Sequence, residues 1–219
     1  MDTNQQALQE LQEGNMEEAA RLLNQAIEEE PDNPVAYINF GNLLAELGEA
    51  EKALRFFEKG IELDSSAAAA YYGAGNVLFN EDKFAEALTM YQQAHKAGLD
   101  DSSLHYMLGM AYFQSGRVPH AMASFKRAVE LDAEDTEARF YYAMSMAQNG
   151  MVEEAVAEFH VVTEQDPEHA DAYFNLGVGY LHTKGAAEAL PYFEQAIEIE
   201  PDHMLAHNGK KEASKLLNE

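Results

Sequence analysis

Two histidines near the end of the sequence have the spacing best suited to binding a metal ion. His203 and His207 are four residues apart, which places both imidazoles on one face of a helix. A zinc site usually needs three or four protein ligands, and no third ligand accompanies this pair. We therefore expect surface histidines here and no metal site.

Glycine-rich stretches and abundant carboxylates are the other features that could suggest catalysis. Gly73-Ala74-Gly75 and Gly177-Val178-Gly179 lie inside helical patterns with no preceding strand, so helix packing explains them better than a phosphate-binding loop does. The sequence has no HExxH and no G-x-S-x-G motif. Carboxylates on a solvated helix face are not general acids. We predict a protein that is not an enzyme, with no catalytic residue and no cofactor.

The charge balance restricts the class of partner. There are 39 acidic and 14 basic side chains, which give a net charge of −25. Nucleic acids and anionic membranes attract basic surfaces, so we predict neither as a partner. Cationic partners would be attracted, although the same charge could simply solvate the outer helix faces. The sequence has no cysteine, no signal peptide pattern and no apolar run of about 20 residues, and we expect a cytoplasmic protein.

The helices that would carry any site are short and come in pairs. One helix face is marked by residues at i, i+3, i+4 and i+7: Tyr173, Leu176, Gly177 and Tyr180. A second helix has its face marked by Ala189, Phe193 and Ala196, and Pro201 ends it. Gly185 lies between the two helices, where the chain must turn.

This pair of helices repeats along the whole sequence. Gly41, Gly75 and Gly109 lie 34 residues apart, and Ala143 and Gly177 continue the series. The aromatic position of the second helix recurs in the same phase at Phe57, Tyr91, Phe125, Phe159 and Phe193. A period of this length is typical of a helical repeat array, in which each unit buries its face against its neighbours.

The pattern Tyr173-x-x-Leu176-Gly177-x-x-Tyr180, followed by Ala189, Phe193, Ala196 and Pro201, resembles the tetratricopeptide repeat family. The resemblance implies an all-α fold, a right-handed superhelical solenoid of antiparallel helix pairs, as one domain over residues 1–219. The repeats are expected at 1–33, 34–67, 68–101, 102–135, 136–169 and 170–203, with a capping helix at 204–218. His105 and Arg139 depart from the pattern, because the family prefers a bulky aromatic residue there.

Three prolines give expectations about individual helices. Pro34 and Pro119 suit the first turn of a helix, where the missing N–H is not needed. Pro191 falls in the second turn of an otherwise well-patterned helix, so we expect that helix to start late or to bend there.

The resemblance also implies a binding groove on the concave side, lined by the first helix of each repeat. The predicted groove residues are Ile38, Asn39, Asn42, Tyr72, Asn76, Phe79, Tyr106, Met110, Phe113, Phe140, Met144, Phe174, Val178 and Leu181. Ala147 and His182 lie on the same helix faces. Exposed aromatic and methionine side chains in a row are typical of a binding surface, and amides such as Asn42 and Asn76 can hold a peptide backbone. The alternative is that rings such as Phe79 and Phe113 are buried between neighbouring helices.

The groove residues also indicate the kind of ligand. They include no lysine or arginine, which disfavours an acidic peptide held by its terminal carboxylate. We predict a protein-protein interaction scaffold that binds a neutral or basic protein or peptide segment with apolar anchors. A regulatory or targeting subunit for a separate enzyme and a self-associating module are alternatives, and RNA binding is disfavoured by charge. The oligomeric state stays open.

Overall fold

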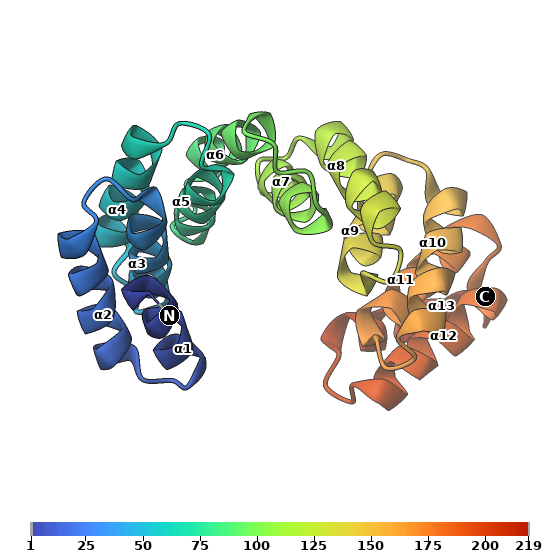
Figure 1. The fold of residues 1–219 in the computed structure, drawn as a ribbon. Helices are drawn as coiled ribbons and strands as arrows, with labels where there is room; N and C mark the ends of the chain where they lie inside the picture. Colours follow the sequence, from blue (N-terminus) through green and yellow to red (C-terminus); the bar gives the residue numbers. More distant parts are fainter. Residues whose placement is uncertain (1, 219) are drawn as a thin grey trace. The chain divides into compact units, whose positions relative to one another are not determined.

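The computed structural model of the protein describes residues 2–218. Within them are thirteen α-helices and no strand, which confirms the predicted all-α repeat array (Figure 1). The first helices of the six repeats are α1 (Thr3–Gln12), α3 (Pro34–Glu46), α5 (Ala68–Asn80), α7 (Ser102–Gln114), α9 (Thr136–Gln148) and α11 (Ala170–Thr183). The second helices are α2 (Met16–Glu29), α4 (Ala50–Leu63), α6 (Phe84–Lys96), α8 (Val118–Leu131), α10 (Val152–Gln165) and α12 (Ala186–Ile199). The last helix is α13 (Met204–Leu216).

The helices group into two compact units. Unit 1 ends at Ser115 and unit 2 begins at Gly116, so the division lies between α7 and α8. In unit 1, α3 packs against α4 and α5, and in unit 2, α11 packs against α10 and α12. A single continuous domain over residues 1–219 stays a prediction. None of the described helices is long and apolar enough to cross a bilayer.

Polar side chains and prolines determine where several helices begin. Asp101 accepts a hydrogen bond from the backbone N–H of Leu104 at the start of α7, which satisfies one of the donors that a first turn leaves unpaired. Pro34 is the first residue of α3, and Pro119 lies in the first turn of α8, as predicted. Gly185 turns the chain between α11 and α12 with a φ of 113°, a conformation that favours glycine.

Pro191 does not delay the helix that contains it. We expected this helix to start late or to bend, but α12 begins at Ala186, before the proline, so the late start is wrong. Ala189 and Phe193 on either side of Pro191 are fully buried, whereas Pro191 itself is exposed. Packing of the buried face stabilises the helix despite the lost backbone hydrogen bond, because helices in proteins depend mainly on such burial.

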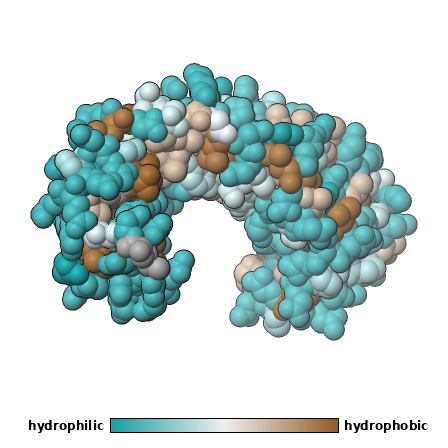
Figure 2. Space-filling model, in the orientation of Figure 1, coloured by the Kyte–Doolittle hydropathy of each residue, from teal (hydrophilic) through white to brown (hydrophobic). Residues whose placement is uncertain are grey.

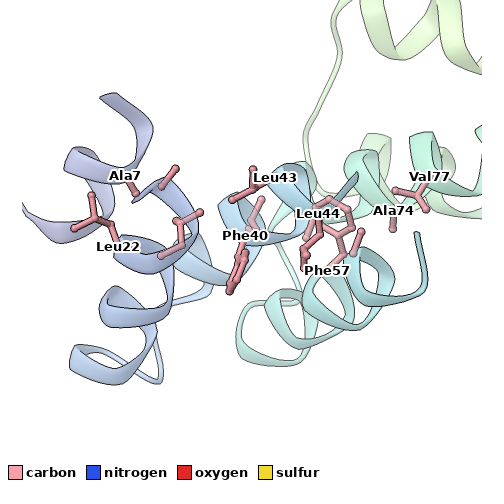
Figure 3. Packing of buried hydrophobic residues seen from close by; sticks show 13 residues of the cluster. Ala7, Leu22, Phe40, Leu43, Leu44, Phe57, Ala74 and Val77 are labelled. Atoms are coloured by element: carbon pink, nitrogen blue, oxygen red, sulfur yellow. The ribbon is translucent and has the colours of Figure 1, made fainter. Parts of the chain in front are cut away.

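The core of each unit is built from aromatic rings that lie on residues with little or no side chain. The ring of Phe193 is fully buried, and a Cβ added to Gly177 would come within 2.6 Å of it. The ring of Phe57 lies in the same way against Gly41 and Gly73. Figure 3 shows Phe57 close to Leu44 in the core of unit 1. Glycine on these faces therefore allows the helices to approach closely, as the sequence predicted.

Candidate functional site

The predicted groove residues lie on α3, α5 and α7 of unit 1 and on α9 and α11 of unit 2. Asn42 and Val178 are exposed, whereas Ile38 and Phe140 are buried, each with 8% of its surface exposed. The remaining ten are partly exposed: Asn39, Tyr72, Asn76, Phe79, Tyr106, Met110, Phe113, Met144, Phe174 and Leu181. Figure 2 shows the general setting, in which hydrophobic residues appear among a largely hydrophilic surface. Whether any of these residues contacts a partner stays a prediction.

Phe140 belongs to the core of unit 2, so the expectation that its ring is exposed is wrong. Its ring centroid lies 5.7 Å from that of Phe159 and 5.5 Å from that of Tyr141. The imidazole of His169, which precedes α11, covers it, with the ring centroids 4.6 Å apart. Ile38 is buried for a similar reason in unit 1, where its side chain lies against the Gly60 backbone of α4. These contacts leave neither side chain free to anchor a ligand.

Two histidines act as helix caps, a role that the sequence did not suggest. Nδ1 of His169 accepts a hydrogen bond from the backbone N–H of Ala172, and Nδ1 of His203 accepts one from Ala206. Repeats two, four and five use Asn33, Asp101 and Asp135 at this position, whereas repeat three has Ala67 and no side-chain cap. The 34-residue period is the signal that could have revealed the caps. His203 Nε2 lies 3.2 Å from an Asp171 carboxylate oxygen.

The imidazole of His207, the other histidine of the pair that was considered for metal binding, contacts the backbone. Nε2 of His207 lies 2.8 Å from the backbone carbonyl of Pro201, a hydrogen-bonding distance. The ring of His203 is buried against Phe174, with the centroids 5.2 Å apart. Packing and capping therefore account for His203, which is buried and is not the surface histidine that we expected, whereas His207 is exposed and its ring contacts the backbone of Pro201.

In unit 1 the predicted groove combines tyrosine with amides. The Tyr91 hydroxyl donates a hydrogen bond of 2.9 Å to Oδ1 of Asn76, and the ring of Tyr72 lies 5.8 Å from that of Tyr91. Burial raises the pKa of Tyr72 and that of Tyr91, so both hydroxyls stay protonated and able to donate at neutral pH. Asn39 donates to Oδ1 of Asn4 at 3.0 Å. Two of the three expected amide clamps are thus partly used within the protein.

Asn42 keeps its amide available to a ligand. Its side chain is exposed on α3 and makes no hydrogen bond to any of the described residues. An amide offers a donor and an acceptor together, which matches the backbone of an extended peptide. Of the predicted amides, Asn42 is therefore the one best placed to hold such a backbone.

In unit 2 an apolar cleft of about 400 Å³ opens beside Val178. It lies among the end of α9, the start of α10 and the middle of α11. The lining residues are Ala147, Gly150, Val152, Ala155, Val156, Phe159, Asn175, Val178, Gly179 and His182. Asn175 and His182 are the polar side chains in this set, so the cleft can bury an aliphatic group and offer hydrogen bonds at its edge.

Glycine and valine bring the walls of this cleft together. A Cβ added to Gly179 would overlap a methyl group of Val156, so α11 approaches α10 closely only because Gly179 has no side chain. Val178 was predicted, and Ala147 and His182 were placed on the same helix faces. Val152 and Val156 were missed because they belong to a second helix. From the sequence, Gly179 was assigned to helix packing, which is correct. It was not placed in the lining of a cleft, because the other wall of that cleft belongs to α10.

Family comparisons agree with this repeat architecture. Models described as tetratricopeptide repeat match residues 10–76 and 112–177, residues 72–136, and residues 170–203. A comparison with curated protein sequences finds no significant match.

Solved structures of similar fold include one of high sequence identity. YrrB, described as a TPR protein with an unusual peptide-binding site, is 47% identical with a TM-score of 0.83, covering 88% of this chain and 99% of its own. The pilF protein of Pseudomonas aeruginosa is 18% identical with a TM-score of 0.81, covering 96% of each chain. MamA is 20% identical with a TM-score of 0.72, covering 77% of this chain and 92% of its own. The last two show the fold alone.

The family matches run from residue 10 to residue 203 and cover the helices from α2 to α12, together with the end of α1. This fold is that of a protein-protein interaction scaffold. The chain is a member of the tetratricopeptide repeat family.

Proposed function

We propose that this protein binds an extended peptide segment of a partner protein, with an apolar side chain of that segment held in the cleft beside Val178. The observation that carries the proposal is the cleft itself, which is mainly apolar and yet open to solvent. Val178 is 44% exposed, so covering it with a ligand would remove apolar surface from water. The described peptide-binding site of YrrB supports a peptide as the class of ligand.

The charges around the cleft favour a basic segment. Glu153 and Glu154 directly follow the lining residue Val152, and all three begin α10. Asp171 lies one turn before Asn175 on α11, and its side chain is exposed. Exposed carboxylates attract lysine and arginine in a salt-dependent way. We therefore propose a ligand in which basic residues flank the apolar anchor.

The proposed activity is binding and not catalysis. Among the described residues the buried polar side chains are Ser145, Thr163 and His203, none of which is a carboxylate. We propose a non-enzymatic scaffold that acts in the cytoplasm. Roles as a targeting subunit for a separate enzyme or as a self-associating module stay alternatives.

A charge placed in the cleft should weaken peptide binding. The test compares two fluorescent peptides, each with one central leucine. Lysines flank the leucine in one peptide, and glutamates flank it in the other. Fluorescence anisotropy should show tighter binding of the lysine peptide, and Val178→Asp should weaken it by about tenfold or more, because the anchor loses an apolar contact. Added salt should also weaken binding.

The matched control is Leu131→Asp, which adds the same charge at another partly exposed apolar residue of unit 2, away from the cleft. This variant should bind the lysine peptide as the unchanged protein does. Equal losses in both variants, or preference for the glutamate peptide, would contradict the proposal.

A further inference from the structure

His95, Asp100 and His105 bring three potential metal-binding atoms together at the connection between α6 and α7 of unit 1. His95 lies in the last turn of α6, Asp100 in the connection and His105 in the first turn of α7. Their ligand atoms all lie within 4.8 Å of one another. Nε2 of His105 lies 2.6 Å from Oδ1 of Asp100, and Nδ1 of His95 lies 3.8 Å from the same oxygen.

The side chain of His95 is unusual for its position in the repeat. The residues one or more periods away are all β-branched: Ile27, Ile61, Val129, Thr163 and Ile197. The position of His105 holds Thr3, Tyr37, Tyr71, Arg139 and Tyr173 in the other repeats, and His207 in the last helix. No other repeat carries histidine at both positions, and among the described residues this connection is the one place where two imidazoles and a carboxylate come together.

The backbone of this connection also departs from the repeat. The other second helices contain 14 residues, whereas α6 contains 13. Gly98 follows with a φ of 105°, at a position where the other repeats have aspartate or glutamate. This conformation favours glycine. The backbone change therefore lies between His95 and Asp100, within the cluster itself.

We propose that this cluster binds a divalent transition metal ion such as Zn²⁺, through Nδ1 of His95, a carboxylate oxygen of Asp100 and Nε2 of His105. Imidazole and carboxylate are ligands that Zn²⁺ prefers, and three protein ligands with water in the fourth position form a common site. Zn–N and Zn–O bonds of about 2.0–2.2 Å at tetrahedral angles require ligand atoms about 3.3–3.5 Å apart. The two distances to Asp100 lie on either side of this value.

Small side-chain rotations can bring the three groups to that geometry. The His95 side chain is 50% exposed and can turn toward Asp100, whereas the His105 side chain is 12% exposed and is held by its surroundings. Nδ1 of His95 lies 3.0 Å from the carbonyl of Leu99. Metal binding replaces this contact, and each ring then carries its proton on the nitrogen that faces away from the metal.

A hydrogen bond between His105 and Asp100 explains part of the cluster without a metal. It does not account for His95, whose ring centroid lies 5.4 Å from that of His105, or for the changed backbone at Gly98. A metal ion uses both rings and the carboxylate together. It would also link the last turn of α6 to the first turn of α7, so binding should raise the melting temperature of the protein.

Isothermal titration of the full chain with Zn²⁺ in excess Mg²⁺ tests the proposal. One Zn²⁺ should bind per chain in the tightest step, and His95→Ile and His105→Tyr should each weaken that step by more than about tenfold. Both substitutions introduce residues that other repeats carry, so the fold should tolerate them. If both variants melt at the same temperature as the unchanged protein in the presence of a chelator, the fold tolerates the substitutions.

His207→Tyr is the matched control, because it makes the same change at the same repeat position in unit 2. It should leave the tightest Zn²⁺ step unchanged. If it weakens binding as much as His105→Tyr does, or if the unchanged protein binds no more tightly than a variant that carries both His95→Ile and His105→Tyr, Zn²⁺ is attracted only by the general negative charge and the proposal is wrong.

A measurement on the unchanged protein avoids any effect of substitution on folding. Nitrogen NMR of the imidazole rings should show the signals of His95 and His105 shifting together and saturating at one equivalent of Zn²⁺. Shifts at other histidines, with these two unchanged, would overturn the proposal.

Discussion

The third and sixth repeats place different side chains on the same arrangement of helices. In repeat three, Tyr91 lies against Gly75, and in repeat six, Phe193 lies against Gly177. Both rings are fully buried. The phenylalanine only packs, whereas the Tyr91 hydroxyl also needs an acceptor, because a buried polar group without a hydrogen bond is costly.

That acceptor changes the surface next to the ring. Asn76 accepts the hydrogen bond from Tyr91, and the equivalent residue in repeat six is Val178, which is exposed beside the cleft. Tyr72 in repeat three is likewise replaced by Phe174 in repeat six. The comparison teaches that one buried hydroxyl makes the neighbouring surface polar, and its absence allows an apolar surface. These two surfaces should therefore suit different chemical groups.

Removal of either buried ring should have the largest effect on stability. Phe193→Ala and Tyr91→Ala should each lower the free energy of unfolding by about 3–5 kcal/mol, because each leaves a cavity between two helices. Urea unfolding followed by circular dichroism measures the loss. A loss below about 1 kcal/mol in one variant would mean that its repeat closes around the cavity, and the two repeats would then differ in packing as well as polarity.

Loss of the acceptor in repeat three should have a smaller effect. Asn76→Val introduces the residue of repeat six and leaves the Tyr91 hydroxyl buried without its partner, so stability should fall by about 1–3 kcal/mol. The reverse change, Val178→Asn, should leave stability nearly unaltered, because Val178 is exposed. The same urea experiment compares the two. Recovery of stability in the double variant Asn76→Val with Tyr91→Phe would show that the hydroxyl causes the loss.

A still smaller loss of stability at neutral pH than that of Asn76→Val is expected from Tyr91→Phe, which should cost about 1 kcal/mol through the lost hydrogen bond. At alkaline pH the same substitution should change the free energy of unfolding in the opposite direction. Burial raises the pKa of Tyr91 in the folded protein above its ordinary value of about 10. The protonated Tyr91 side chain therefore contributes to stability below about pH 10. This stability is lost as the pH rises further, because Tyr91 ionises in the unfolded chain before it ionises in the folded protein.

Unfolding experiments at neutral pH and at about pH 11 test this dependence. The free energy of unfolding of the unchanged protein should fall between the two, and Tyr91→Phe should reduce that fall. Other tyrosines with raised pKa, such as Tyr72 and Tyr141, remain in both proteins and provide the common background. An equal fall in both proteins would show that Tyr91 does not ionise on unfolding in this range.

Most of the fold follows from short-range patterns in the sequence. Pro34 and Pro119 mark the starts of helices, and Gly185 marks a turn, because their backbone preferences act locally. The buried position of Phe193 follows from the 34-residue period, because the same place in each repeat meets the same kind of neighbour. The late start expected at Pro191 was wrong because distant packing outweighed a local preference.

The candidate site could be predicted only in part. Val178 was found because it lies on the exposed face of a first helix. Phe140 has the same repeat position as Phe174, yet only Phe140 is buried to 8%. The rings of His169 and Phe159 lie 4.6 and 5.7 Å from that of Phe140, closer than the equivalent rings of His203 and Phe193 lie to Phe174, at 5.2 and 6.0 Å. The exposure of a side chain depends on every element packed against it, which a periodic pattern on one helix does not contain.

The sequence by itself determined that the chain forms paired helices with a 34-residue period, with glycine or alanine on the first helix and an aromatic residue on the second at fixed positions of five repeats. These features depend on backbone conformation and on a repeated spacing, both of which are written in the order of residues. Only the tertiary structure decided that α9, α10 and α11 leave a cleft beside Val178, and that His95 and His105 face the same carboxylate. Both depend on distances between side chains of different helices, which are set when the helices pack together.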